Sequence, residues 1–292
     1  MTINGKITIK DALSYGTKML SETGNIDVPL LECEILLGYI LNIERIKLYL
    51  DRDRLLNDSE KEAFLSVLKR RIEYEPVSYI TNNKEFMSLS FYVEKGVLIP
   101  RPETETLVEL ILNELKGKKD MSILDICTGS GSIAVSLAYY LKDSKLTAID
   151  KYDVCIKAAK INAEKYNLTD RIEFVKADIL NDTITDEKFD CIVSNPPYIK
   201  KETLSSLPED VKNYEPEYAL DGGDDGLIFY RKITSIAENN LIDEGLLFFE
   251  IGFEQGKDVC EILNKSGKFK NIKVTKDLAG LDRIVTAVKG AW

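Results

Sequence analysis

Apolar residues recur every three or four positions through the first part of the chain. In one stretch they fall at Phe64, Leu65, Leu68 and Ile72, a spacing that predicts an amphipathic helix. The same pattern, with proline in a first turn or glycine beyond a last one, bounds further helices. The expected helices are Lys10–Glu22, Pro29–Ile40, Ile43–Leu50 and Asp58–Ile72. Residues 1–80 are therefore predicted to form a small helical bundle.

Between Glu85 and Pro100 the pattern changes to an alternation of apolar and polar residues. This alternation is interrupted at Glu94-Lys95-Gly96. Alternating runs on either side of a turn predict a short β-hairpin. We expect the hairpin, within residues 81–100, to link the helical bundle to a second domain over residues 101–292. That domain should open with a helix from Glu103 to about Leu115.

From Met121 onward, short apolar runs alternate with segments of helical spacing. The expected helices are Ser132–Leu141, Val154–Asn167, Gly226–Asn240 and Lys257–Lys265. The expected strands are Ser122–Cys127, Lys145–Asp150, Arg171–Ala177, Phe189–Ser194, Gly245–Ile251, Phe269–Thr275 and Arg283–Val288. This alternation predicts an α/β fold with a doubly wound, mostly parallel seven-stranded sheet. No helix separates the last two strands, so one of them should run antiparallel.

The composition is that of a globular protein, with 44% hydrophobic and 30% charged residues. No apolar run is long enough to span a bilayer, and the N-terminus lacks the apolar core and cleavage site of a signal peptide. The five cysteines are scattered without a Cys-x-x-Cys pair, which favours reduced thiols over a disulfide frame or a metal cage. We therefore expect a cytoplasmic protein with no metal site and no membrane partner.

Two further features narrow the chemistry. The formal net charge is −10, and because nucleic-acid binding draws on clustered Lys and Arg, this charge weighs against a nucleic-acid partner. The chain also has no histidine. Its absence excludes histidine acid–base catalysis, histidine-containing triads and histidine-ligated zinc. Any reaction must proceed without an imidazole.

A glycine-containing loop follows the first predicted strand of the sheet. The strand Ile123–Cys127 runs into Thr128-Gly-Ser-Gly131 and then into a helix. Glycine lets the backbone turn tightly and approach a ligand, and a helix N-terminus offers free N–H groups. The next strand ends on Asp150, 19 residues after Gly131. A carboxylate at that point can accept hydrogen bonds from both ribose hydroxyls of an adenosine cofactor.

The loop alone does not decide which adenosine cofactor binds, because Gly129-x-Gly131-x-x-Ala134 also satisfies the dinucleotide fingerprint. Asp125 favours S-adenosylmethionine over NAD, since a carboxylate would repel a pyrophosphate but suits the ammonium group of a methionine moiety. Asp178 could accept from the adenine amino group or simply cap its loop, and Ile179 could cover the ring. The candidate cofactor-binding residues are Cys127, Thr128, Gly129, Ser130, Gly131, Asp150, Asp178, Ile179 and Asn195.

The predicted strand ending at Ser194 runs directly into Asn195-Pro-Pro-Tyr198. Ligands of doubly wound sheets bind beyond the carboxyl ends of the strands, so this motif should face the cofactor. Because prolines remove competing N–H donors, the Asn195 side chain and the Pro196 carbonyl can accept the two hydrogens of a planar NH2 group. Tyr198 can stack on the flat face of the substrate. We predict Asn195, Pro196 and Tyr198 as catalytic residues, and Asn195, Pro196, Pro197 and Tyr198 as substrate contacts.

Several stretches together resemble one known family. They are Gly96-Val-Leu-Ile-Pro-Arg-Pro-Glu-Thr-Glu105, Asp125–Gly131, Asn195–Ile199, Glu215–Gly226, Glu250-Ile-Gly252 with Gln255, and Asp277–Arg283. In these stretches, which span most of the chain, the sequence is similar to the release-factor glutamine methyltransferases (the PrmC/HemK family). The Asn-Pro-Pro-Tyr box alone is shared with adenine methyltransferases, whereas residues 99–105 and 215–226 are far more specific.

The resemblance implies a class I methyltransferase (Rossmann-like) fold with S-adenosylmethionine as methyl donor. The implied substrate is the glutamine amide in the Gly-Gly-Gln motif of class I peptide-release factors, whose methylation modulates translation termination. The helical bundle would dock the release factor, and we expect a monomer that needs no direct nucleic-acid contact. Cys127 and Asn82 stand where glycine is common in relatives, so both must fit unusual backbone dihedrals. Contacts from Arg101 and Thr104 to the methionine end of the cofactor are left undecided.

Four other functions compete with this interpretation. A ribosomal-protein glutamine methyltransferase is the nearest rival, followed by an adenine amino-group methyltransferase on nucleic acid, which the net charge opposes. An NAD-dependent dehydrogenase would need a proton relay, and the chain has neither histidine nor a Tyr-x-x-x-Lys pair. A catalytically idle binding module would be expected to lack Asn195 or the glycine loop, and both are intact.

Overall fold

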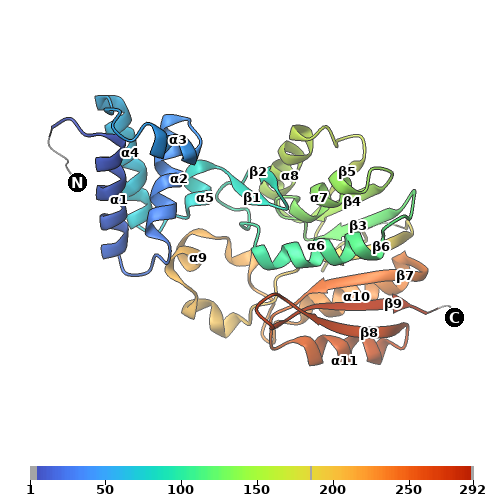
Figure 1. Ribbon diagram of the computed structural model, residues 1–292. Coiled ribbons are helices and arrows are strands. Elements are labelled where there is room, and N and C mark those ends of the chain that lie inside the picture. Colours follow the sequence, from blue (N-terminus) through green and yellow to red (C-terminus); the bar gives the residue numbers. More distant parts are fainter. Residues whose placement is uncertain (1–4, 185, 291–292) are drawn as a thin grey trace. The chain divides into compact units, whose positions relative to one another are not determined.

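The computed structural model describes residues 5–184 and 186–290, and the chain divides into two compact units (Figure 1). The first unit runs to Asn83 and also includes Pro208–Tyr214. The second unit comprises Lys84–Leu207 and the chain from Glu215 onward. The sequence did not predict that Pro208–Tyr214 belongs with the N-terminal helices. Within the first unit, the Tyr214 hydroxyl donates a hydrogen bond to the carbonyl of Glu73 at 2.6 Å.

The first unit is a bundle of helices around an apolar core that includes Leu20, Leu36 and Phe64. Capping boxes at Thr8 and Asn57 satisfy the first backbone N–H groups of two of its helices. The four helices predicted from periodicity are confirmed, but two short ones were not predicted, because five or six residues carry little periodic signal. Its helices are α1 (Ile9–Glu22), α2 (Pro29–Leu41), α3 (Arg45–Leu50), α4 (Asp58–Ile72), α5 (Val77–Thr81) and α9 (Glu209–Tyr214).

The second unit opens with an antiparallel hairpin of β1 (Lys84–Phe86) and β2 (Leu89–Phe91). The sequence predicted a hairpin interrupted at Glu94–Gly96, and that position of the turn was wrong. The chain turns at Met87 and Ser88, whose φ angles are 50° and 56°. Two left-handed central residues make a tight hairpin turn, but this turn lacks the Asn and Gly that usually reveal it. Glu94–Gly96 is a separate turn, closed by a Val97 N–H to Glu94 carbonyl bond of 3.0 Å.

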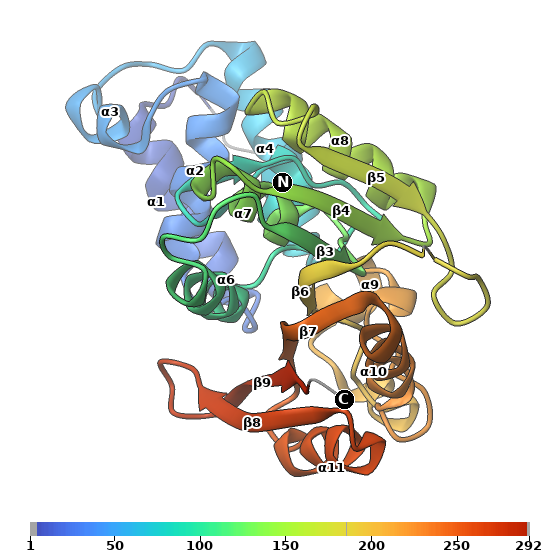
Figure 2. The ribbon, with the colours of Figure 1, turned by 90° about the vertical axis from the view of Figure 1, so that its right-hand side faces the viewer.

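Within the described residues, seven strands form one twisted sheet in the order β5-β4-β3-β6-β7-β9-β8 (Figure 2). The pairs from β5 to β7 are parallel, and β9 runs antiparallel to both of its neighbours. The predicted α/β, mostly parallel seven-stranded fold is confirmed, including one antiparallel strand in the final pair. The strands are β3 (Ser122–Ile126), β4 (Lys145–Asp150), β5 (Ile172–Lys176), β6 (Phe189–Ser194), β7 (Leu241–Glu250), β8 (Phe269–Lys276) and β9 (Asp282–Lys289).

Helices cover both faces of this sheet, because successive strand residues point to opposite sides. Ile123 packs in one core with α6 (Pro102–Glu114), α7 (Ser132–Tyr140) and α8 (Asp153–Lys165). Leu124 packs in a second core with α10 (Ile228–Asn240) and α11 (Gly256–Ser266).

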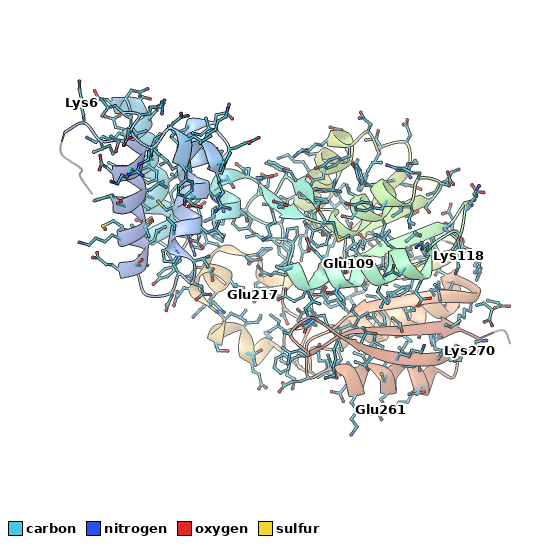
Figure 3. All side chains as sticks on the ribbon, in the orientation of Figure 1. Lys6, Glu109, Lys118, Glu217, Glu261 and Lys270 are labelled. Atoms are coloured by element: carbon cyan, nitrogen blue, oxygen red, sulfur yellow. The ribbon has the colours of Figure 1, made fainter. Side chains whose placement is uncertain are left out.

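Charged side chains lie on the outer sides of these helices. Figure 3 labels Glu109 on α6 and Glu261 on α11, and both are exposed. Two short 3₁₀ turns, η1 (Lys201–Ser206) and η2 (Glu217–Ala219), lie in the connection between β6 and α10. In the described part of the chain, no helix combines the length and apolar character needed to cross a membrane.

The strand order reverses between β3 and β6. From β3 the chain builds outward through β4 to β5, and it then returns to place β6 and β7 on the other side of β3. The loops that leave β3 and β6 therefore diverge over opposite faces of the sheet. Such a switch point leaves a crevice beyond the carboxyl ends of the strands, where doubly wound sheets bind their ligands.

Candidate active site

A cavity of about 950 Å³, its open mouth included, lies beyond the carboxyl ends of β3, β4, β5 and β6. Most of the residues predicted to contact cofactor or substrate line it, namely Cys127, Thr128, Gly129, Ser130, Asp150, Asp178, Ile179, Asn195 and Pro197. Gly131, Pro196 and Tyr198 are not among the described residues that line it.

The loop after β3 adopts left-handed backbone conformations. Cys127, Gly129 and Gly131 have φ angles of 63°, 56° and 77°. The φ of Cys127 explains why glycine suits this position, since a cysteine there carries backbone strain. A Cβ added to Gly129 would meet no atom within 4 Å, so its backbone leaves open space for a ligand in the cavity. Gly131 has a packing role, because a Cβ there would lie 2.9 Å from the Cβ of Ala159 on α8.

Asp125 holds this loop from within the core. Its Oδ2 accepts hydrogen bonds from the Thr128 hydroxyl at 2.7 Å and from the Ala134 N–H at 3.2 Å. The side chain is fully buried, and burial raises its pKa to about 7. Asp125 does not line the cavity in the described residues, so its observed role is to clamp the loop. The Asp125 side chain therefore does not reach the cavity, where a ligand ammonium group would bind.

Asp150 connects the ends of β4 and β3. Its Oδ2 accepts the Gly129 N–H at 2.9 Å, and its Oδ1 accepts the Tyr152 N–H at 3.0 Å. Burial raises the pKa of Asp150, while these two N–H groups oppose that shift. A carboxylate has more lone pairs than these two bonds use. Asp150 can therefore hold the loop and still accept hydrogen bonds from a ligand.

Of the two roles that the sequence left open for Asp178, the structure shows the loop cap, and contact with adenine stays a prediction. Asp178 lines the cavity, and it also closes its own loop by accepting the Leu180 N–H at 3.1 Å and the Asn181 side-chain amide at 2.8 Å. Lys151 forms an ion pair with it at 2.9 Å. This lysine and the loop donors lower the pKa of Asp178. Ile179 beside it is buried and contributes an apolar wall.

Asn195 lies at the first position beyond β6. The preceding residue, Ser194, donates its hydroxyl to the Ile126 carbonyl at 2.6 Å, which fixes the end of β6 against β3. The Asn195 side-chain nitrogen donates to the Thr104 hydroxyl oxygen of α6 at 3.2 Å. Thr104, Asn195 and Pro197 all line the cavity.

The rest of the Asn-Pro-Pro-Tyr motif is held by a glycine-rich segment. The Tyr198 carbonyl accepts a hydrogen bond from the Gln255 side chain at 3.0 Å. A Cβ added to Gly222 would lie 2.8 Å from the Tyr198 Cα. A Cβ added to Gly226 would lie 2.5 Å from the Tyr198 carbonyl oxygen. Only glycine permits this approach. The Tyr198 ring packs against the core beneath α10, and burial raises its pKa to about 12.

Several lining residues were missed because no sequence pattern marks them. Tyr152 and Tyr218 stack with ring centroids 3.5 Å apart, and Phe229 of α10 adds a further aromatic ring to the wall. Arg101, left undecided from the sequence together with Thr104, also lines the cavity, and its guanidinium donates to the Glu215 carboxylate at 2.6 Å. These residues come from segments that are distant in sequence, so only the fold brings them together.

The cavity thus combines a backbone cradle, carboxylates at two strand ends, an apolar and aromatic wall, and one preorganised amide. Such a set can bind an adenosine-containing ligand and hold a second, planar polar group beside Asn195. Because the chain has no histidine, no imidazole takes part in chemistry at this site.

The sequence of this chain is similar to known protein families and to named proteins. Residues 11–81 match the family described as PrmC N-terminal domain, and residues 101–209 match that described as Methyltransferase small domain. A protein from Clostridium acetobutylicum named Release factor glutamine methyltransferase is 42% identical over 97% of this chain and 99% of its own length. A protein of that name from Clostridium botulinum is 40% identical over 96% of this chain and 99% of its own length.

Solved structures share the fold. A methyltransferase from Pyrococcus furiosus superimposes with a TM-score of 0.53 at 20% identity, over 77% of this chain and 100% of its own. The human methyltransferase 10 domain containing protein gives a TM-score of 0.50 at 20% identity, over 69% of this chain and 90% of its own. At these identities the likeness shows the fold alone.

Proposed function

Because this chain belongs to the family of release factor glutamine methyltransferases, we propose that it methylates the Gly-Gly-Gln glutamine of class I peptide-release factors. The methyl group of S-adenosylmethionine is transferred to the side-chain amide nitrogen, and the modification tunes translation termination. The chain matches its relatives over nearly their full length, so the proposal concerns the whole activity.

The observation that carries the proposal is the position of Asn195. It stands at the switch point, on the wall of the cavity, with its side-chain nitrogen held by Thr104. An amide fixed in this way offers its oxygen to one hydrogen of a substrate NH2 group, and the adjacent Pro196 carbonyl serves the other. The planar glutamine amide is then held in place as it reacts, which favours the transition state over the ground state.

The residues present fit S-adenosylmethionine. Gly129 leaves open space in the cradle, Asp150 keeps acceptor capacity for ribose hydroxyls, and Ile179 supplies an apolar surface for adenine. When bound, this cofactor supplies an electrophilic sulfonium methyl group. The chain's own residues orient the acceptor nitrogen. This nitrogen loses one proton when it gains the methyl group, and water at the open mouth of the cavity can accept that proton.

The helical first unit is proposed to dock the release factor, since its residues 11–81 match the PrmC N-terminal domain. A cytoplasmic location and a monomeric state remain predictions of the sequence.

The proposal is tested by incubating the purified full chain with a class I release factor and S-adenosylmethionine, followed by mass spectrometry of a proteolytic digest. We expect a gain of one methyl group on the peptide that contains Gly-Gly-Gln, and none when its glutamine is replaced by alanine. Ribosomal proteins and an adenine-containing DNA duplex serve as parallel substrates. Methylation of either one in preference to the release factor would overturn the proposal.

A further inference from the structure

Asn195 has a buried acidic neighbour on the adjacent strand. In the parallel pairing of β6 with β7, Ser194 lies opposite Phe249. The next residues along the two strands are Asn195 and Glu250, so the register places these two beside each other at the edge of the switch point. Glu250 is only 1% exposed.

One oxygen of the Glu250 carboxyl group lacks a hydrogen-bond partner among the described residues. This oxygen, Oε2, is buried. Arg283 on the neighbouring strand β9 is engaged by Asp277 at 3.1 Å. A buried carboxylate with an unpaired oxygen lowers the stability of the folded protein. A glutamate kept at this position despite that cost calls for a functional explanation.

Charged and titratable groups lie near Glu250 on four segments. They are Arg283 of β9, Glu103 of α6, Tyr198 of the loop after β6 and Tyr230 of α10. Burial raises the pKa of Glu250 to about 7, against the opposing effects of the Thr104 hydroxyl, Arg283 and the Asn195 amide. The carboxyl group can therefore ionise near neutral pH.

Thr104 contacts the Asn195 amide, and its hydroxyl lowers the pKa of Glu250. Thr104 is 3% exposed, and its hydroxyl oxygen accepts the Asn195 side-chain N–H at 3.2 Å. A hydroxyl has one hydrogen to donate. An ionised carboxylate can only accept, so a Glu250 carboxylate near Thr104 would attract the Thr104 hydrogen and leave the Thr104 oxygen to accept from the Asn195 nitrogen.

We propose that Glu250 is a positioning residue for methyl transfer, which acts through the Thr104 hydroxyl to set which way the Asn195 amide faces. The two ends of an asparagine amide have almost the same shape but opposite hydrogen-bonding character. With its nitrogen held by Thr104, Asn195 presents its oxygen to the substrate NH2 group. In the reversed orientation it would present a donor to a donor. This inference rests on the proposed function.

The first test compares isosteric variants in the full chain. Glu250→Gln and Thr104→Val should each lower the turnover of release-factor methylation by roughly tenfold or more, as for loss of one preorganised contact. Thr104→Ser keeps the hydroxyl and should restore most of the turnover lost in Thr104→Val. Thr234→Val is the matched control, because it removes a buried hydroxyl of α10 that has no partner among the described residues and does not line the cavity. Equal turnover in Thr104→Ser and Thr104→Val would overturn the proposal.

The second test asks whether Glu250 acts through Asn195. In an Asn195→Ala background, the Glu250→Gln change should have almost no further effect on turnover, because the residue that it orients is gone. A Glu250→Gln effect of the same size in both backgrounds would mean that the acid acts on its own, and the proposal would be wrong.

The third test does not depend on methylation. In the unliganded full chain, the side-chain NH2 resonances of Asn195 in ¹⁵N NMR spectra should titrate with a midpoint near the Glu250 pKa of about 7. Glu250→Gln should abolish this titration. Resonances that ignore pH in both proteins would refute the positioning role, even if release factors are methylated. A wild-type chain that shows the titration yet leaves release factors unmodified would instead refute the proposed function.

Discussion

The Asp150 carboxylate accepts the backbone N–H of Gly129 at 2.9 Å, and this contact joins the end of β4 to the loop after β3. Asp150 is 8% exposed and lines the cavity, while Gly129 forms part of the backbone cradle. The Asp150 side chain therefore both holds the loop after β3 and faces the ligand cavity. Removing this side chain should affect the conformation of the loop and the binding of the ligand.

We predict that Asp150→Ala weakens S-adenosylmethionine binding by more than about tenfold, because ribose hydroxyls lose a charged acceptor and the loop loses its tether. Isothermal titration calorimetry measures this directly. Asp190→Ala is a matched control, since Asp190 accepts the Ser122 N–H at 2.8 Å at the opposite end of β3 and does not line the cavity. Equal affinity in Asp150→Ala and the unmodified chain would remove Asp150 from the cofactor site.

Gly131 yields a second prediction. Alanine at this position would have a φ of 77° and a Cβ 2.9 Å from Ala159. Gly267, which ends α11, has a similar φ of 68° but nothing within 4 Å of an added Cβ. Gly131→Ala should therefore destabilise the protein by roughly 1–3 kcal/mol more than Gly267→Ala, in the range of overpacked sites. Urea unfolding of both variants gives the difference, and equal losses would exclude the clash as the cause.

The sheet could be predicted from the sequence because its physical signal is local. Buried strands such as Phe189–Ser194 are mostly apolar runs, and other strands, such as Ser122–Ile126 and Lys145–Asp150, are each followed by a segment of helical spacing. The hairpin turn was misplaced because its left-handed residues, Met87 and Ser88, are neither glycine nor asparagine. The connection over residues 201–219 folds into short 3₁₀ and α segments. These segments are too short to show a helical period of hydrophobic residues in the sequence.

The candidate site was predictable only in part. Residues at strand ends, such as Asp150 and Asn195, were found because a parallel sheet gathers its carboxyl ends at one edge. Thr104 and Glu250 belong to segments far from Asn195 in sequence, and their relation depends on the pairing of β6 with β7. Asp125 was expected beside the ligand, but its side chain turned out to bond the loop from the core. The pairing register of two strands and the direction of a side chain depend on residues far apart in the sequence, so a local sequence pattern does not predict them.

The first unit leads to a third prediction. Deleting residues 1–80 should leave a chain that binds S-adenosylmethionine with affinity within a few-fold, since the described residues that line the cavity all belong to the second unit. The same deletion should abolish methylation of intact release factor. Calorimetry and a methylation assay on one preparation measure both properties. If the truncated chain methylates release factor as fast as the full chain, the first unit is not a recognition domain.

The pH dependence of stability gives a fourth prediction. Burial raises the pKa of Glu250 from 4.5 to about 7, so the folded protein holds this proton at pH values where the unfolded chain has lost it. The stabilising contribution of the proton is complete below about pH 4.5 and is lost as the pH rises to about 7. Between pH 5 and pH 8, the unmodified chain should therefore lose stability relative to Glu250→Gln, as measured by urea unfolding. A stability difference that stays constant across this range would contradict the raised pKa.

The last prediction concerns the reacting centre. Asn195→Ala should leave the affinity for S-adenosylmethionine largely intact and lower turnover on release factor by at least ~10²-fold, as for a preorganised contact that acts in the transition state. Asn240→Ala is the matched control, because Asn240 is also buried but donates to the Glu187 carbonyl at 2.8 Å and does not line the cavity.

The Asn195→Asp variant tests whether the side chain at this position acts as a hydrogen-bond acceptor or only fills the space. A carboxylate keeps an acceptor for the substrate N–H but cannot donate to Thr104, as Asn195 does at 3.2 Å. Partial turnover should survive, between that of Asn195→Ala and the unmodified chain. It should survive because the oxygen that meets the substrate is retained while the bond that orients it is lost. Full turnover in Asn195→Ala would show that the amide does not hold the reacting nitrogen, and the mechanism would then have to rest on the Pro196 carbonyl alone.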